Sequence, residues 1–378
     1  MIINNVKLVL ENEVVHGSLE VQDGEIRAFA ESQSRLPEAM DGEGGWLLPG
    51  LIELHTDNLD KFFTPRPKVD WPAHSAMSSH DALMVASGIT TVLDAVAIGD
   101  VRDGGDRLEN LEKMINAIEE TQKRGVNRAE HRLHLRCELP HHTTLPLFEK
   151  LVQREPVTLV SLMDHSPGQR QFANREKYRE YYQGKYSLTD AQMQQYEEEQ
   201  LALAARWSQP NRETIAAMCR ARHIAIASHD DATHAHVAES HQLGSVIAEF
   251  PTTFEAAQAS RKHGMNVLMG APNIVRGGSH SGNVAASELA QLGLLDILSS
   301  DYYPASLLDA AFRVADDESN RFTLPQAVKL VTKNPAQALN LQDRGVIGEG
   351  KRADLVLAHR KGNHIHIDHV WRQGKRVF

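Results

Sequence analysis

The sequence predicts an α/β fold: a (β/α)8 TIM-like barrel with a small β-sandwich domain built from both termini. Two observations support this fold class. After residue 50, eight short apolar runs alternate with amphipathic stretches whose apolar residues recur every three or four positions. Near both ends of the chain, short strand patterns lie between turn signals instead. Eight alternating strands and helices match a closed parallel barrel, and an open α/β sheet with one or two misassigned runs is the alternative.

The β domain is expected from residues 1–49 together with residues 336–378. In the first segment, short strand patterns separated by Asn, His-Gly and Asp-Gly turn signals cover residues 6–10, 13–15, 18–21 and 25–29. Residues 345–357 and 369–378 are again hairpin-like. We therefore expect the two ends of the chain to complete one small domain beside the barrel.

The barrel is expected from residues 50–335. The apolar runs predicted as its strands are residues 51–54, 90–96, 132–139, 157–163, 223–227, 245–249, 266–269 and 294–298. Residues 167–215 interrupt this rhythm, because they are rich in Gln, Glu, Arg and Tyr. This segment predicts two or three polar helices inserted after one strand. They are interpreted either as a solvated helical excursion or as a lid or subunit contact.

Composition excludes several classes of protein. The chain has 378 residues, and 40 Lys plus Arg against 50 Asp plus Glu give a net charge of −10, which argues against broad nucleic-acid binding. Neither an apolar run of about 18 residues nor a signal-peptide pattern is present, so we expect no membrane association. Cys137 and Cys219 lie in apolar stretches, which indicates a reducing cytoplasm and excludes a disulfide framework or a cysteine metal site.

Histidine is unusually frequent, since 20 histidines outnumber 10 Phe plus 7 Tyr. Position decides which of them carry chemistry, because the carboxyl ends of barrel strands face the active site. Histidines and carboxylates follow five of the predicted strands, and such a mixed set suits one or two divalent metal ions. The candidate ligands are His55, Asp57, Glu138, His165, His229 and Asp301. Each one alone could instead be a helix-capping or supporting polar residue.

Two motifs carry a resemblance to the amidohydrolase superfamily over nearly the whole chain. They are the leader Leu48-Pro-Gly-Leu-Ile-Glu-Leu-His-Thr-Asp57 and a trailer formed by Asn334-Pro-Ala and Gly348-Glu-Gly-Lys-Arg-Ala-Asp-Leu-Val356. The resemblance implies a metal-dependent barrel whose first strand usually ends His-x-His and whose two metals are commonly bridged by a carboxylated lysine. Here Asp57 replaces the second histidine, and Glu138 is in the position where the resemblance implies a bridging carboxylate. Asp301 matches the superfamily's general base.

The strand positions of the histidines differ from the usual pattern of that superfamily. By our strand count His165 ends the fourth strand and His229 the fifth, whereas the superfamily usually places these two ligands on the fifth and sixth strands. The resemblance thus implies catalytic roles for Asp301, as the base, and for Glu138, as a bridge between two metals. It leaves the metal as zinc, manganese or iron.

The chain is similar in more detail to a divergent branch of the superfamily, the diphosphatases of the carbon–phosphorus lyase pathway. The segments that carry this resemblance are Glu53-Leu-His-Thr-Asp-Asn-Leu-Asp60, Met163-Asp-His-Ser-Pro-Gly-Gln-Arg-Gln171, Ser228-His-Asp-Asp-Ala232, the stretch 270–283 and Ser299-Ser-Asp-Tyr-Tyr-Pro304. It implies a small-molecule substrate, α-D-ribose 1-methylphosphonate 5-triphosphate, which is cleaved to pyrophosphate and the 5-phosphate.

A polyphosphate substrate needs local cations in a chain of net charge −10, and three loops offer them. In the loop after the seventh strand, glycines let backbone N–H groups approach an anion, and neighbouring side chains add donors. The candidates there are Arg276, Gly277, Gly278, Ser279 and His280. Lys61, Arg66 and Lys68 follow the first strand, and Arg170 lies in a third loop. Each of these cations could equally be an ordinary surface charge.

Two other functions compete with this interpretation. A cyclic-amide hydrolase or deaminase on the same fold would share the metals, and the Arg276 loop argues for phosphates instead. A catalytically inactive barrel that serves as an assembly subunit would have lost strand-end ligands, whereas this chain retains a complete set. We expect a homo-oligomer.

Overall fold

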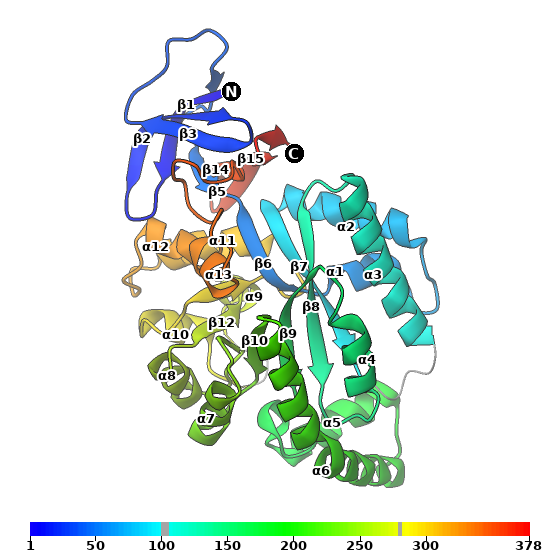
Figure 1. Ribbon diagram of the computed structural model, residues 1–378. Helices are drawn as coiled ribbons and strands as arrows, with labels where there is room; N and C mark the ends of the chain where they lie inside the picture. Colours follow the sequence, from blue (N-terminus) through cyan, green and yellow to red (C-terminus); the bar gives the residue numbers. More distant parts are fainter. Residues whose placement is uncertain (100–105, 279–281) are drawn as a thin grey trace.

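Eight parallel strands form a nearly closed barrel in the computed structural model, which describes residues 1–99, 106–278 and 282–378 (Figure 1). Each strand pairs with the next one in the chain, and a parallel bridge between Thr56 and Asp301 joins the last to the first. The strands are β6 (Leu51–Thr56), β7 (Ile89–Ile98), β8 (Glu130–Glu138), β9 (Val157–Met163), β10 (Ala225–His229), β11 (Ile247–Glu249), β12 (Asn266–Gly270) and β13 (Ile297–Ser299). All eight predicted runs overlap these strands, so the fold class is confirmed.

Helices cover the outside of the barrel, and a layer of apolar side chains fills its inside. The outer helices include α1 (Asn58–Phe63), α2 (Ala73–Ala86), α3 (Asp106–Arg124), α4 (Thr144–Leu151), α7 (His234–Gln242), α8 (Phe254–Lys262), α10 (Ala286–Gln291), α11 (Ser306–Asp316) and α12 (Leu324–Lys329). Inside, Leu54, Leu93 and Leu268 belong to one buried cluster with Ala336 of α13 (Lys333–Ala338). This part of the barrel interior is therefore a packed apolar core.

As predicted, both ends of the chain contribute to one small β domain beside the barrel, and its strands form a single eight-stranded sheet where a sandwich was expected. Its strands are β1 (Ile2–Val9), β2 (Val14–Gln22), β3 (Glu25–Ala30), β4 (Met40–Asp41), β5 (Trp46–Pro49), β14 (Leu355–Lys361), β15 (His364–Arg372) and β16 (Lys375–Arg376). Gly50 alone separates β5 from barrel strand β6, and a Cβ at this position would lie 2.1 Å from Thr90 Oγ1. Only glycine permits so close a passage from the sheet into the barrel.

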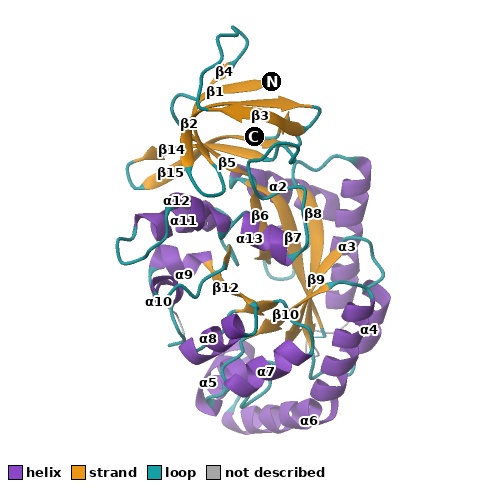
Figure 2. Cartoon of the chain, turned by 60° about the vertical axis from the view of Figure 1, so that its left-hand side comes forward, coloured by secondary structure: helices purple, strands orange, loops and turns teal. Residues whose placement is uncertain are grey.

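The polar insertion after β9 consists of helices. After the short 3-10 helix η1 (Arg170–Phe172), α5 (Arg175–Tyr186) begins with Asn174 as N-cap, and α6 (Asp190–Ala221) begins with a Thr189–Gln192 capping box. The last turns of α6 pack on the barrel through Ile215 and Cys219. Figure 2 shows the labelled parts of α5 and α6 at the end of the molecule away from the terminal sheet.

Within the described part of the chain, no helix is both long enough and apolar enough to cross a membrane.

A buried network of histidines and carboxylates attaches α2 to the barrel wall. Asp94 of β7 lies 2.6 Å from His80 Nε2 and 2.8 Å from His131 Nδ1, and the other ring nitrogen of His131 lies 2.8 Å from Asp81. Burial alone would lower the pKa of His131, but the charges of Asp94 and Asp81 outweigh it and raise that pKa to about 9. The network does not line the candidate active site described below, so it supports the fold.

This network predicts a pH-dependent loss of stability. A histidine whose pKa is raised in the folded state stabilises fully below its unfolded pKa of about 6.5, and its contribution is lost as the pH rises through about 9. We expect His131→Gln to lower the melting temperature clearly at pH 6.5, and the difference from wild type to shrink as the pH approaches 10. A difference that stays constant from pH 6.5 to 10 would contradict a charged His131.

Candidate active site

The carboxyl ends of the barrel strands surround a cleft of about 490 Å³. Five of the six predicted metal ligands line this cleft: His55, Asp57, His165, His229 and Asp301. They come from strands that are far apart in the sequence, and the parallel barrel brings their ends together. Within the cleft the side chains form two neighbouring groups, each with three residues whose nitrogen or oxygen atoms could hold a metal ion.

The first group contains His55, Asp57 and Asp301. His55 Nε2 lies 3.9 Å from Asp57 Oδ2 and 3.7 Å from Asp301 Oδ1. His55 is near the end of β6 and Asp57 directly follows the strand, two positions later, which allows both side chains to face the cleft. One imidazole and two carboxylates at this separation are typical ligands for a divalent cation.

Barrel closure fixes the position of this first group. The backbone N–H of Asp301 donates to the carbonyl of His55 over 3.2 Å. The buried carboxylate of Glu53 accepts from the N–H of His55 at 2.8 Å and from the N–H of Ser300 at 2.7 Å. Because Glu53 spans β6 and the end of β13, it holds the two strands that carry the ligands in register.

The second group contains His165, His229 and Asp230. His229 Nε2 lies 3.3 Å from Asp230 Oδ2, and His165 Nε2 lies 3.6 Å from the same oxygen. Both histidines were expected from the sequence, and Asp230 was not. Asp230 directly follows His229 and adopts a left-handed conformation with φ of 56°, so the strict alternation of a strand does not apply to it.

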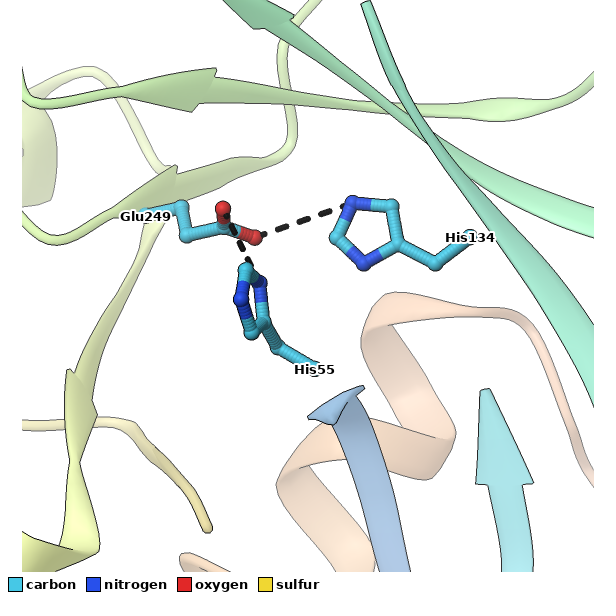
Figure 3. A group of neighbouring side chains, drawn as sticks. All are labelled: His55, His134 and Glu249. Atoms are coloured by element: carbon cyan, nitrogen blue, oxygen red, sulfur yellow. Dashed lines mark ion pairs between the residues drawn. The ribbon is translucent and has the colours of Figure 1, made fainter. Parts of the chain in front are cut away.

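A buried glutamate that the sequence analysis missed joins the two groups. Glu249, at the end of β11, lies 2.7 Å from His229 Nδ1 and 3.3 Å from His55 Nδ1, and it is fully buried. Figure 3 shows its carboxylate between His55 and His134, whose Nε2 is 3.8 Å away. Glu249 is hydrogen-bonded to His229 Nδ1 and lies within ion-pair distance of His55 Nδ1, so the Nε2 atoms of both rings are left to face the cleft.

His134 is also buried beside Glu249, but both of its ring nitrogens have protein partners. Nδ1 lies 2.9 Å from the carbonyl of Leu54, and Nε2 contacts the hydroxyl of Ser161. Burial lowers the pKa of His134 to about 4, so the ring is neutral at pH 7. We infer that His134 supports the ligands and leaves metal binding to its neighbours.

Glu138 lies in a different place from the one expected of a bridging ligand. Its carboxylate contacts His165 Nδ1, and it belongs to neither three-residue group among the described residues. Glu138 therefore orients His165 in the same way that Glu249 orients His55 and His229. Burial alone would lower the pKa of His165, but the negative charge of Glu138 raises that pKa to about 10.

The residues expected to bind phosphates divide into two sets, those that line the cleft and those that do not. Arg276, Gly277 and Gly278 line the cleft, and both glycines have positive φ, at 75° and 79°. Ser279 and His280 lie outside the described residues. The structure does not bring the other candidates into the cleft: Lys61 donates to the carbonyl of Tyr302, Arg66 and Lys68 are exposed on the loop after α1, and Arg170 is buried with its Nε 3.0 Å from Asp231.

A further cation that the sequence analysis missed is Arg136. It lies inside β8, lines the cleft, and places its Nη1 3.2 Å from Asp57 Oδ1. Burial alone would raise the pKa of Asp57, but Arg136 and His55 hold it below its ordinary value. Burial raises the pKa of Asp301, and the nearby charge of Asp57 adds to this rise against the opposing effect of His55. Of the two aspartates, Asp301 is thus the better proton acceptor.

Three comparisons relate the chain to known proteins. A family model described as the amidohydrolase family matches residues 82–378. The chain is 98% identical, over 378 residues that make up 100% of both chains, to the alpha-D-ribose 1-methylphosphonate 5-triphosphate diphosphatase of Escherichia coli (strain K12).

Two solved structures with similar folds have low sequence identity. N-acetylglucosamine-6-phosphate deacetylase from Thermotoga maritima has a TM-score of 0.62 at 14% identity, over 100% of this chain and 99% of that one. 5-Methylcytosine deaminase from Klebsiella pneumoniae has a TM-score of 0.58 at 17% identity, over 100% and 98%. At these identities the likeness supports the fold alone.

Proposed function

This chain belongs to the amidohydrolase family, and we propose that it hydrolyses α-D-ribose 1-methylphosphonate 5-triphosphate to α-D-ribose 1-methylphosphonate 5-phosphate and pyrophosphate. It is a metal-dependent hydrolase that acts on a phosphoric anhydride. The observation that carries this proposal from the geometry is the shared cleft, in which two groups of possible metal ligands lie beside Arg136 and Arg276. The identity of 98% to a diphosphatase selects this substrate among the phosphate esters and anhydrides that such a cleft could take.

The ligand chemistry fits one divalent cation in each group. His55, Asp57 and Asp301 would hold one ion, and His165, His229 and Asp230 the other, and zinc, manganese and iron all accept such mixed imidazole and carboxylate sets. Bound divalent cations supply a Lewis acid that polarises water and draws charge from phosphoryl oxygens.

The remaining steps belong to side chains of this chain. Asp301 accepts a proton from the attacking water as the anhydride bond between the α- and β-phosphorus atoms breaks. The water hydroxyl joins one phosphorus, and the bridging oxygen leaves with the other phosphorus and takes the proton that Asp301 accepted. Arg136, Arg276 and the N–H groups near Gly277 and Gly278 offset the charge of the triphosphate and of the pyrophosphate that departs.

The products distinguish this function from that of an amide hydrolase or deaminase. With the metal-loaded protein and the ribose triphosphate, ³¹P NMR should show pyrophosphate and the 5-phosphate in equal amounts. Release of orthophosphate without pyrophosphate, or no phosphorus product together with release of ammonia from a heterocycle, would refute the proposal. We also propose that the protein works in the cytoplasm as a homo-oligomer.

Replacement of Arg276 should weaken substrate binding without removing metal. Arg276→Ala deletes a guanidinium that lines the cleft, and a hydrogen bond to a charged group contributes about 1.5–3 kcal/mol, so we expect KM to rise at least about tenfold. The metal content should stay at the wild-type value. Arg66→Ala is the matched control, because Arg66 is exposed and does not line the cleft.

Loss of metal from Arg276→Ala in proportion to its loss of activity would show that Arg276 supports the metal groups instead. An equal rise in KM for Arg66→Ala would indicate a long-range charge effect and would also count against a direct contact.

A further inference from the structure

A second cavity of about 380 Å³ lies beside the cleft, under the helical insertion. His165 lines both the cleft and this cavity, so the cavity adjoins the second metal group. Its most prominent lining residues are four tyrosines, Tyr178, Tyr182, Tyr186 and Tyr196, with Lys185 among them. We call this space the tyrosine cavity. The diphosphatase mechanism outlined above makes no use of it.

The sequence of α5 explains how the cavity is built. Tyr178, Tyr182 and Tyr186 recur every four residues, so they share one face of the helix, and Tyr196 of α6 faces them. The ring centroids of Tyr182 and Tyr196 are 5.7 Å apart, and those of Tyr186 and Tyr196 are 5.8 Å apart.

Packing of α5 on α6 alone would explain an aromatic stripe, but it does not explain the polar lining. Gln192, Gln195 and Gln200 of α6 surround the same space, and Lys185 Nζ lies 5.3 Å from the centre of the Tyr186 ring. Burial and the neighbouring Glu138 raise the pKa of Tyr182, so its hydroxyl remains protonated and can donate a hydrogen bond. The cavity thus offers ring faces, hydroxyls, amides and one lysine, together with the carboxylates of Glu138, which contacts His165, and of Glu199.

The two ends of the proposed substrate differ in charge. The triphosphate end carries several negative charges, and it needs the metal groups and the two arginines of the cleft. The other end carries two ribose hydroxyls and a methylphosphonate ester, which has a single negative charge and an apolar methyl group. Lys185 is the one lysine or arginine among the described residues that line the tyrosine cavity, and of the two carboxylates there Glu138 already contacts His165. The cavity therefore has one lysine for a singly charged group and no cluster of cations for a triphosphate.

We propose that the tyrosine cavity binds the ribose 1-methylphosphonate end of the substrate, while the triphosphate occupies the cleft on the other side of His165. This inference rests on the proposed function. Sugar rings lie against the aromatic faces, the glutamines and tyrosine hydroxyls bind the ribose hydroxyls, and Lys185 pairs with the phosphonate. The insertion then determines which ribose triphosphates are accepted.

The test compares two substrates on the metal-loaded full-length protein. One is α-D-ribose 1-methylphosphonate 5-triphosphate, and the other is ribose 5-triphosphate, which lacks the phosphonate. We expect Lys185→Gln to lower kcat/KM for the first substrate about tenfold or more and to leave the second within about twofold. Tyr182→Phe, which keeps the ring and removes one hydroxyl, should raise KM for both substrates with little change in kcat.

Arg179→Gln is the matched control, because Arg179 is on the same helix, has the same charge, binds Glu197 and does not line the cavity. It should affect neither substrate. A second measurement is direct: ribose 1-methylphosphonate without phosphates should bind to wild type in calorimetry and more weakly to Lys185→Gln.

The inference and the proposed function fail in different ways. If wild type hydrolyses neither ribose triphosphate to pyrophosphate, the proposed function is wrong. If wild type is active but Lys185→Gln changes both substrates equally or changes neither, the tyrosine cavity is not the phosphonate site. Equal effects of Lys185→Gln and Arg179→Gln would also overturn the inference, since they would indicate only a general change in the insertion.

Discussion

Asp301→Asn should lower kcat by about 10²- to 10⁴-fold, which is the usual contribution of a general base. Asparagine has the same shape and can keep the backbone hydrogen bond to His55 that closes the barrel, but its amide cannot accept the proton of the attacking water. The variant should therefore fold normally and bind substrate with a KM close to that of wild type. Steady-state kinetics and circular dichroism measure the two effects separately.

The control for this prediction is Asp316→Asn. Asp316 lies at the end of α11, where it is exposed and pairs with Arg360, so its replacement should leave kcat unchanged. An Asp301→Asn enzyme with wild-type kcat would remove Asp301 from the mechanism, whatever its role in holding a metal.

Glu249→Gln should weaken metal binding at both groups, because one buried carboxylate orients His55 and His229 together. The amide carries no charge, so it attracts His55 and His229 less strongly, and the orientation of their Nε2 atoms toward the cleft is less fixed. Changes of this kind in residues that support metal ligands typically reduce metal affinity or activity 10- to 100-fold. We expect low metal content after purification and partial recovery of activity when divalent metal is added in excess.

Glu255→Gln provides the comparison, since Glu255 is an exposed residue in the first turn of α8. It should retain its metal and its activity. If Glu249→Gln also retains both at wild-type levels, Glu249 does not position the histidines, and the connection between the two groups must lie elsewhere.

The strand-end rule predicted much of the site because a parallel barrel brings its carboxyl ends together. It located His55, Asp57, His165, His229 and Asp301 in one cleft. Glu249 obeys the same rule, as the last residue of the sixth predicted strand, and could have been found by it. Arg136 could also have been found, because it is two positions before Glu138 on β8 and therefore shares its face.

Other features depend on local geometry that a pattern does not contain. Asp230 is next to His229, so a regular strand would point it away, and its left-handed backbone turns it into the site. Arg170 has an equally unusual φ of 41°, and its guanidinium is buried against Asp231. From the sequence alone, a cation in a loop beside the active site cannot be assigned to substrate or to a buried ion pair.

We propose that the two groups of ligands in the cleft each hold a divalent cation. Anomalous X-ray diffraction from crystals of the metal-loaded protein tests it most directly. We expect two peaks, one among His55, Asp57 and Asp301 and the other among His165, His229 and Asp230. A peak coordinated by Glu138 as a bridge, or no peak in this cleft in crystals of active enzyme, would contradict it.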